Sequence, residues 1–151
     1  MDEACSEESL RATIIELSHE FGTPEYVRGG GGNTSVKTAG TLWVKPSGTT
    51  LAGLTADRLV PLDRTQLQRL YEMEPPPEPT ARESLVRDAM LAAVQAGAAG
   101  RPSVEAPLHD TFTRRFVVHT HPALVNGLTC ARDGEAAARE LFPDAMWVPY
   151  V

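Results

Sequence analysis

Four consecutive glycines at residues 29–32 constrain the fold more than any other feature of this sequence. Glycine lacks a Cβ and is unfavourable inside helices and strands, so the run predicts a loop that can approach other groups closely. Before it, residues 6–21 have a serine cap and apolar side chains at helical spacing, which predict an amphipathic helix ended by a left-handed Gly22. After it, residues 34–37 and 41–45 predict two short strands joined by a turn.

The middle of the chain predicts further short elements around a proline-rich segment. A strand is expected near residues 59–62 and a helix over 65–71. Residues 72–80 contain "EMEPPPEPT" and predict an extended, exposed loop within one domain. Residues 81–97 are rich in alanine and leucine and predict a long helix closed by Gly97.

The last third alternates between helix and strand signals. Ser103 is expected to cap a helix, residues 115–120 predict a buried strand, and Pro122 fits the first turn of the next helix. Residues 133–142 predict a short helix capped by Asp133, and 145–151 predict a strand that has just begun. The mixture predicts an α/β or α+β fold.

Composition bounds the class of protein. The chain has 151 residues, which suits a single domain over 1–151. Its net charge is −6 and no basic stripe is interleaved with aromatic residues, so nucleic acid is not expected as a partner. No apolar run is long enough to span a membrane, and the acidic start lacks the pattern of a signal peptide. The two cysteines, Cys5 and Cys130, form no disulfide framework, which favours a cytoplasmic location.

The segment "FVVHTHPALVNG" contains the strongest chemical signal. In a strand, residues i and i+2 point to the same side, so His119 and His121 can converge on one cation, and imidazole suits zinc. The alternative is a pair of surface histidines. Glu105 and His109 are spaced to share a helix face, so either can supply a third ligand, or Glu105 a general base. The alternative for these two is an ordinary pair on a helix surface.

Three small polar clusters predict an anionic or polyhydroxylated ligand. The glycine run is followed by Asn33 and Ser35, "PSGTT" at 46–50 offers hydroxyl groups and a glycine amide, and Ser103 adds another hydroxyl. Each cluster taken alone favours a turn over a binding site. Together they favour a ligand with a phosphate group.

The order of the motifs is more specific than any one of them. "GGGGNTSVK", "LWVKPSGT", "RPSVEAPLH" and "VVHTHP" follow one another along the chain. This series resembles the class II aldolase/adducin family from about residue 8 onward, most closely the aldolase domains of the bifunctional rhamnulose-1-phosphate aldolase/alcohol dehydrogenase type. The resemblance implies a three-layer α/β/α sandwich with a mostly antiparallel central sheet, and a homo-oligomer, commonly a tetramer.

The resemblance also implies roles for individual residues. His119 and His121 would bind Zn²⁺, and Glu105 would be the catalytic acid/base. The residues around the substrate phosphate would be Gly32, Asn33, Ser47, Gly48 and Ser103.

Two positions depart from the family pattern. Val104 stands where the aldolases often have a second hydroxyl, and the third zinc histidine, expected well after His121, is absent from this chain. The expectation is therefore a domain shortened at its C-terminus that binds zinc weakly and turns over slowly or not at all.

The implied activity is cleavage of a ketose 1-phosphate into dihydroxyacetone phosphate and an aldehyde. Three alternatives remain open: an epimerase or dehydratase of pentulose phosphates, a non-catalytic adducin-like interaction domain, and an MPN-type metalloprotease. The last would need a serine and an aspartate where this sequence has Thr129 and Arg132.

Overall fold

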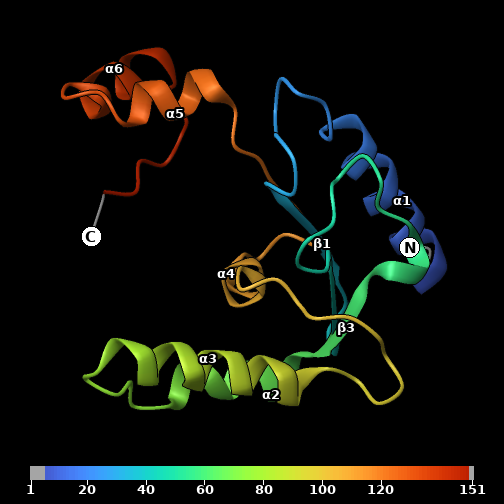
Figure 1. The fold of residues 1–151 in the computed structure, drawn as a ribbon. Coiled ribbons are helices and arrows are strands. Elements are labelled where there is room, and N and C mark those ends of the chain that lie inside the picture. Colours follow the sequence, from blue (N-terminus) through green and yellow to red (C-terminus); the bar gives the residue numbers. More distant parts are fainter. Residues whose placement is uncertain (1–5, 150–151) are drawn as a thin grey trace.

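A four-stranded antiparallel sheet forms the centre of the molecule. The computed structural model describes residues 6–149. The strands are β1 (Asn33–Lys37), β2 (Thr41–Val44), β3 (Val60–Asp63) and β4 (Phe116–His119). They lie in the order β3-β2-β1-β4, and every neighbouring pair is antiparallel (Figure 1). The predicted hairpin at β1 and β2 is confirmed.

Helices pack around this sheet. The α-helices of the described residues are α1 (Glu7–Glu20), α2 (Arg64–Gln68), α3 (Pro79–Ala93), α4 (Ala106–Thr111), α5 (Ala123–Thr129) and α6 (Gly134–Leu141). Two 3₁₀ turns, η1 (Ala56–Arg58) and η2 (Arg69–Glu72), complete the set.

Helix α1 covers one face of the sheet. The hydroxyl oxygen of Ser6 accepts from the backbone N–H of Ser9, which caps the helix as the sequence predicts. Leu10 and Ile14 from α1 pack with Val36 and Trp43 from the sheet. This apolar cluster makes the first of the layers.

The opposite face carries α2, α3 and the start of α4. Leu42 and Val44 point away from α1, as the strand period of two requires, and pack with Leu67, Met90 and Ala106. The sheet therefore lies between two helical layers (Figure 1). This arrangement confirms the predicted three-layer α/β/α fold.

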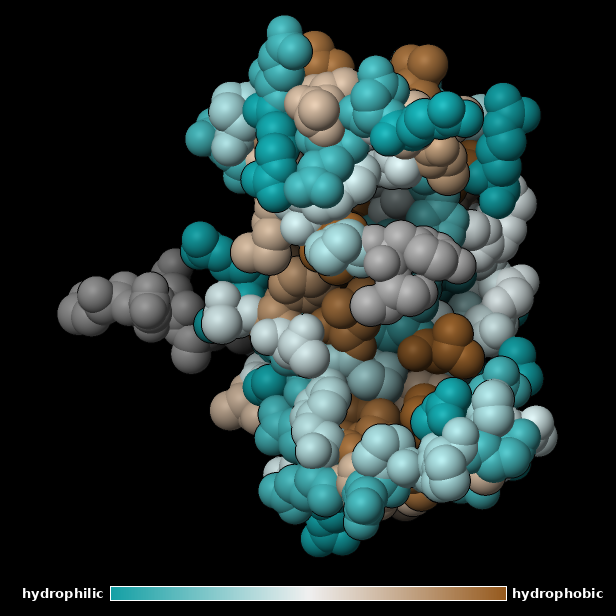
Figure 2. Space-filling model, turned by 90° about the vertical axis from the view of Figure 1, so that its left-hand side faces the viewer, coloured by the Kyte–Doolittle hydropathy of each residue, from teal (hydrophilic) through white to brown (hydrophobic). Residues whose placement is uncertain are grey.

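The pair α5–α6 projects from the rest of the molecule (Figure 1). These helices pack mainly against each other. Several large apolar side chains here are exposed: Leu124, Val125, Leu141, Phe142, Met146 and Val148. Figure 2 shows this side of the molecule, with apolar patches in the region between α5–α6 at the top and α2–α3 at the bottom.

Helix α3 differs from the predicted boundaries at both ends. It begins at Pro79, inside the segment expected to be extended, because Glu78 caps it and proline fits a first helical turn. It ends at Ala93 rather than at Gly97, because Val94 turns extended and forms a bridge to Leu62 at the sheet.

Other local predictions are also corrected. Gly22 has no positive φ; a Cβ there would lie 2.5 Å from the backbone nitrogen of Ala52, so close approach explains the glycine. Strand β4 is half-buried rather than buried. Residues 145–149 form no strand, and 150–151 lie outside the described residues, as does Cys5. Cys130 is a free, exposed thiol.

Candidate metal centre

His119 and His121 lie at the end of the edge strand β4. His119 is the last residue of that strand and pairs across the ladder with Asn33. The Nε2 atoms of the two histidines are 3.1 Å apart, and their ring centroids are 4.8 Å apart. Any two nitrogen ligands of a tetrahedral zinc site lie about 3.3 Å apart, given Zn–N bonds of roughly 2.0–2.1 Å. The convergence expected from the strand period is therefore present.

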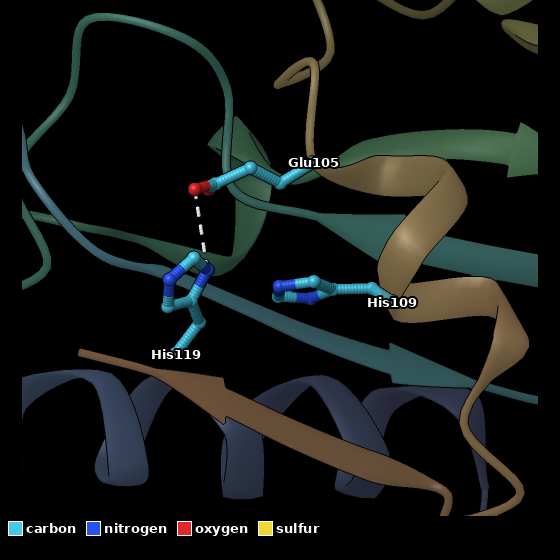
Figure 3. A group of neighbouring side chains, drawn as sticks. All are labelled: Glu105, His109 and His119. Carbon is cyan, nitrogen blue, oxygen red and sulfur yellow. Dashed lines mark ion pairs between the residues drawn. The ribbon is translucent and has the colours of Figure 1, made fainter. Parts of the chain in front are cut away.

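Glu105, at the N-cap of α4, and His109, within α4, also lie close to the ring of His119. The Oε1 atom of Glu105 is 3.2 Å from Nδ1 of His119, at ion-pair distance but without hydrogen-bond geometry. One ligand atom from each of Glu105, His109 and His119 lies within 4.8 Å of the others (Figure 3). Figure 3 shows the three side chains pointing toward one another from α4 and β4.

His109 is the most buried member of the group. It is 1% exposed, and its Nδ1 forms a 2.8 Å hydrogen bond with Oγ of Ser35. Burial lowers the pKa of His109 to about 4, with the charge of His119 acting in the same direction and Glu105 opposing it. The ring is therefore neutral at neutral pH. The interpretation of Glu105 and His109 as a surface pair is wrong for His109.

The hydrogen bond with Ser35 leaves one nitrogen of His109 available. The Nε2 atom is buried and has no hydrogen-bond partner among residues 6–149. If Nδ1–H donates to Ser35, Nε2 keeps a free lone pair, which is the tautomer that a metal ligand requires. Imidazole nitrogen and carboxylate oxygen are also the donors that zinc accepts. The residues present thus fit a divalent cation.

A buried polar network anchors α4. The Nζ of Lys37 donates to the carbonyl oxygens of His109, Asp110 and Phe112 at the end of the helix. The carboxylate of Asp110 accepts from Arg64 at 2.5 Å and from Gln68 at 3.0 Å. Burial lowers the pKa of Lys37, partly offset by the charge of Asp110. These contacts fix the helix that carries Glu105 and His109 against the sheet.

The glycine run lies directly against the histidine segment. Gly32 has a φ of +71°, and a Cβ there would lie 2.8 Å from the carbonyl oxygen of His119. A Cβ on Gly31 would lie 3.4 Å from Nδ1 of His121. The backbone N–H of His121 donates to the carbonyl of Tyr26 at 2.9 Å. The loop therefore holds the histidines in place, and its predicted contact with phosphate stays a prediction.

The remaining predicted site residues fall into two places. The backbone N–H of Ser47 donates to the carbonyl of Arg101 at 2.9 Å, which brings Ser47 and Gly48 beside Ser103. Ser103 is not a helix cap, since α4 starts at Ala106; its hydroxyl instead donates to Oε2 of Glu105 at 3.3 Å. Asn33 lies elsewhere, buried beside His119.

Both polar atoms of the Asn33 side chain are buried and have no partner among the described residues. Buried amide groups in native structures are normally hydrogen-bonded, so this side chain is suited to meet a ligand or an ordered water. The sequence identified Asn33 but not this environment.

The sequence did not predict the contacts that Ser35 and Lys45 make at the candidate site. Ser35 was expected to contact an anion, but its hydroxyl bonds His109 instead. Lys45 was predicted only as the last residue of a short strand. Its Nζ donates to the carbonyl of Thr49 at 2.7 Å and to that of Gly30 at 3.4 Å. Burial lowers the pKa of Lys45, and the nearby charge of Glu105 opposes this.

Comparison with protein families agrees with the motif order. The model described as the class II aldolase and adducin N-terminal domain matches residues 12–149. A Bacillus subtilis (strain 168) protein named uncharacterized oxidoreductase YuxG is 32% identical over 132 residues, which is 81% of this chain and 18% of that protein. The chain thus spans less than a fifth of the length of this curated relative.

Solved structures show the same fold at low sequence identity. The N-terminal class II aldolase domain of a conserved protein from Thermoplasma acidophilum aligns with a TM-score of 0.78 and 21% identity, covering 100% of this chain and 70% of that one. YgbL from Klebsiella pneumoniae, a candidate aldolase/epimerase/decarboxylase, aligns with a TM-score of 0.58 and 21% identity, covering 84% of this chain and 51% of that one. Within the described residues, no helix is long and apolar enough to cross a membrane.

Proposed function

The chain belongs to the class II aldolase and adducin family, and from this premise we propose that it is a zinc-dependent lyase that cleaves a ketose 1-phosphate into dihydroxyacetone phosphate and an aldehyde. The observation that carries the proposal is the convergence of Glu105, His109 and His119 within 4.8 Å, with His121 adjacent. Such a set of nitrogen and oxygen donors is unusual unless it binds a cation.

The histidines and Glu105 would hold the metal. Zinc bound there supplies Lewis acidity toward the carbonyl and hydroxyl oxygens of a sugar. His109 contributes the donor that His119 and His121 lack, since its Nε2 faces the group without another partner. Its lowered pKa favours this role because a protonated imidazole cannot bind a metal.

Glu105 would move the proton. When the carbon–carbon bond breaks, the hydroxyl that becomes the aldehyde loses a proton and the other carbon gains one. Glu105 is half-buried, lies 3.2 Å from His119 and accepts from the hydroxyl of Ser103. These contacts orient its carboxylate next to the proposed substrate position.

The polar clusters would bind the substrate phosphate. Ser47, Gly48 and Ser103 are adjacent to one another and to Glu105. Gly32 and Asn33 lie nearer the histidines, where Asn33 is suited to a substrate oxygen rather than to a distant phosphate. The positive charge of Lys45 interacts favourably with the negative charge of Glu105 in this region.

The wider setting is also part of the proposal: a homo-oligomeric, cytoplasmic enzyme of carbohydrate metabolism, in which residues 1–151 belong to a single class II aldolase-type domain. The alternative of a non-catalytic, adducin-like domain is disfavoured, because it would have no use for the convergent donor groups of Glu105, His109 and His119. The family match favours this reading over a metalloprotease.

Calorimetric titration of the metal-free chain with Zn²⁺ tests the proposal. We expect one ion per chain and a loss of at least tenfold in affinity for His119→Ala, roughly the effect of removing one ligand or its orientation. His19→Ala is the matched control, because His19 is exposed on α1 and bonds only the carbonyl of Leu54.

Activity is then measured on the zinc-loaded chain. A panel of ketose 1-phosphates is assayed for release of dihydroxyacetone phosphate, with Glu105→Gln as the variant expected to lose turnover. Absence of zinc binding, or equal binding by His119→Ala and the parent, would contradict the metal centre. Zinc binding without cleavage of any ketose phosphate would contradict the lyase.

A further inference from the structure

Arg101 lies beside the turn at residues 46–50 and is the first residue of the motif "RPSVEAPLH", in which no role was predicted for it. Its backbone carbonyl accepts from the N–H of Ser47 at 2.9 Å, and Pro46 and Pro102 form an antiparallel bridge beside it. Its guanidinium donates through one NH₂ group to Oγ of Ser47 at 3.1 Å. Arg101 is therefore tied to this turn through both its backbone and its side chain.

The charge of Arg101 is available to a ligand. The side chain is exposed, and none of the ion pairs among the described residues involves it. Ser47 is exposed as well, so an anion can reach both side chains from solvent. A guanidinium has five donors in a planar fork that matches phosphate oxygens, and only one bond to Ser47 uses them.

The hydrogen bond also sets the direction of the Ser47 hydroxyl. Because Oγ accepts from Arg101, the hydroxyl proton of Ser47 remains free to donate to a neighbouring anion. Gly48, at φ +82°, follows directly and turns the chain so that its backbone stays exposed. Arg101 and Ser47 thus present donors together.

We propose that Arg101 is a specificity-determining residue that, with Ser47, binds the phosphoryl group of the substrate; this rests on the proposed function for the identity of that substrate. Val104 contributes no hydroxyl next to Glu105, and it is an exposed apolar side chain. The guanidinium supplies charge-assisted hydrogen bonds in the same segment, which are stronger than those of a neutral hydroxyl.

Binding of inorganic phosphate to the metal-free chain tests this, because no metal and no turnover are needed. The full chain is titrated with phosphate in the presence of a chelator and followed by calorimetry and by NMR shifts of backbone amides. We expect saturable binding at one site, at least about tenfold weaker in Arg101→Gln, the loss expected for one charge-assisted hydrogen bond. Arg101→Lys should lie between them, because it keeps the charge but loses the fork.

Two controls make the result specific. Arg132→Gln removes the same charge from an exposed position between α5 and α6 and should leave phosphate affinity unchanged. Acetate titrated in place of phosphate should bind the parent far more weakly. Thermal melts confirm that Arg101→Gln is folded, as expected for an exposed side chain.

The outcomes separate this inference from the proposed function. Phosphate binding that fails in the parent, that survives in Arg101→Gln, or that falls equally in Arg132→Gln overturns the role of Arg101, whatever the zinc titration gives. Arg101-dependent phosphate binding by a chain that binds no zinc would uphold the role of Arg101 and overturn only the metal-dependent lyase.

Discussion

The ring of His109 is oriented by a hydrogen bond with a single hydroxyl group. Ser35 is fully buried in β1, and its Oγ bonds Nδ1 of His109 from 2.8 Å away. This contact orients the ring of His109, and when Nδ1–H is the donor it leaves the Nε2 lone pair free for a metal. The affinity of the proposed metal centre therefore depends on a serine that touches no metal.

We expect Ser35→Ala to weaken zinc binding by about 10–100-fold, the usual effect of removing a partner that orients a metal-binding histidine. Calorimetric titration of the folded variant measures it. Thr13→Ala is the matched control, since it removes a hydroxyl that bonds only the carbonyl of Ser9 on α1. An unchanged zinc affinity in Ser35→Ala would remove His109 from the metal centre.

Gly32 is the glycine of the run that tolerates no side chain. An alanine there would place its Cβ 2.6 Å from Val27 and 2.8 Å from the carbonyl of His119, at a φ of +71°. The backbone strain alone costs about 1–3 kcal/mol. Gly32→Ala should therefore lower the free energy of unfolding by at least about that amount, measured by urea denaturation. Gly40→Ala, where nothing lies within 4 Å of the added Cβ, should have little effect.

At the scale of elements, Glu78 determines where α3 begins. Its carboxylate accepts from the backbone N–H of Ala81 at 2.7 Å. Hydrogen bonds from the backbone of Ala81 and then Thr80 lower the pKa of Glu78 from its ordinary value. A carboxyl group whose folded pKa is lowered stabilises the fold above its unfolded pKa, and this contribution is lost as the pH falls through the folded pKa.

Glu78→Ala should thus lower the melting temperature at pH 7 by a few degrees, as expected for loss of a helix cap. The difference from the parent should shrink as the pH falls through the lowered pKa of Glu78. Thermal melts followed by circular dichroism across this pH range measure both. A difference that persists unchanged in strong acid would show that the charge of Glu78 is not what caps α3.

Local periodicity explains which elements could be predicted from the sequence. Helix α1 and the β1–β2 hairpin follow from side-chain spacing and caps within a few residues. The two ends of α3 depend on other information. Pro79 starts a helix because Glu78 caps it, and Ala93 ends one because Val94 must reach Leu62 in the sheet. The second is a tertiary contact that no local pattern encodes.

The same distinction between local patterns and tertiary contacts applies to the candidate site. His119 and His121 converge because of the strand period, which is local. The burial of His109 against Ser35, and the contact of Arg101 with Ser47, join residues far apart in the sequence. Such pairs become visible only when β1, α4 and the 46–50 turn are placed in three dimensions.

At the scale of the whole molecule, stability is unevenly distributed. Strands β1 and β2 lie between two apolar clusters, whereas α5 and α6 pack mainly against each other and expose Leu124 and Phe142. Segments with few buried contacts open at low free energy. Hydrogen exchange measured by mass spectrometry should therefore be much faster in the amides of α5–α6 than in those of β1–β2. Equal protection would mean that these two helices are covered, as in an oligomer.

The pairing of β1 with β4 has a consequence for the order of folding. Asn33 lies opposite His119, so β1 meets the segment that carries the candidate metal donors only after a very long stretch of chain has been closed. Contacts of this kind are slow to form, because the entropy of loop closure is lost before the contact is made. The α1–β1–β2 segment can assemble first, and the histidine segment docks against it last. The contact of His109 with Ser35 in β1 would then form in this final step, so the rise in zinc affinity during refolding would report when it occurs.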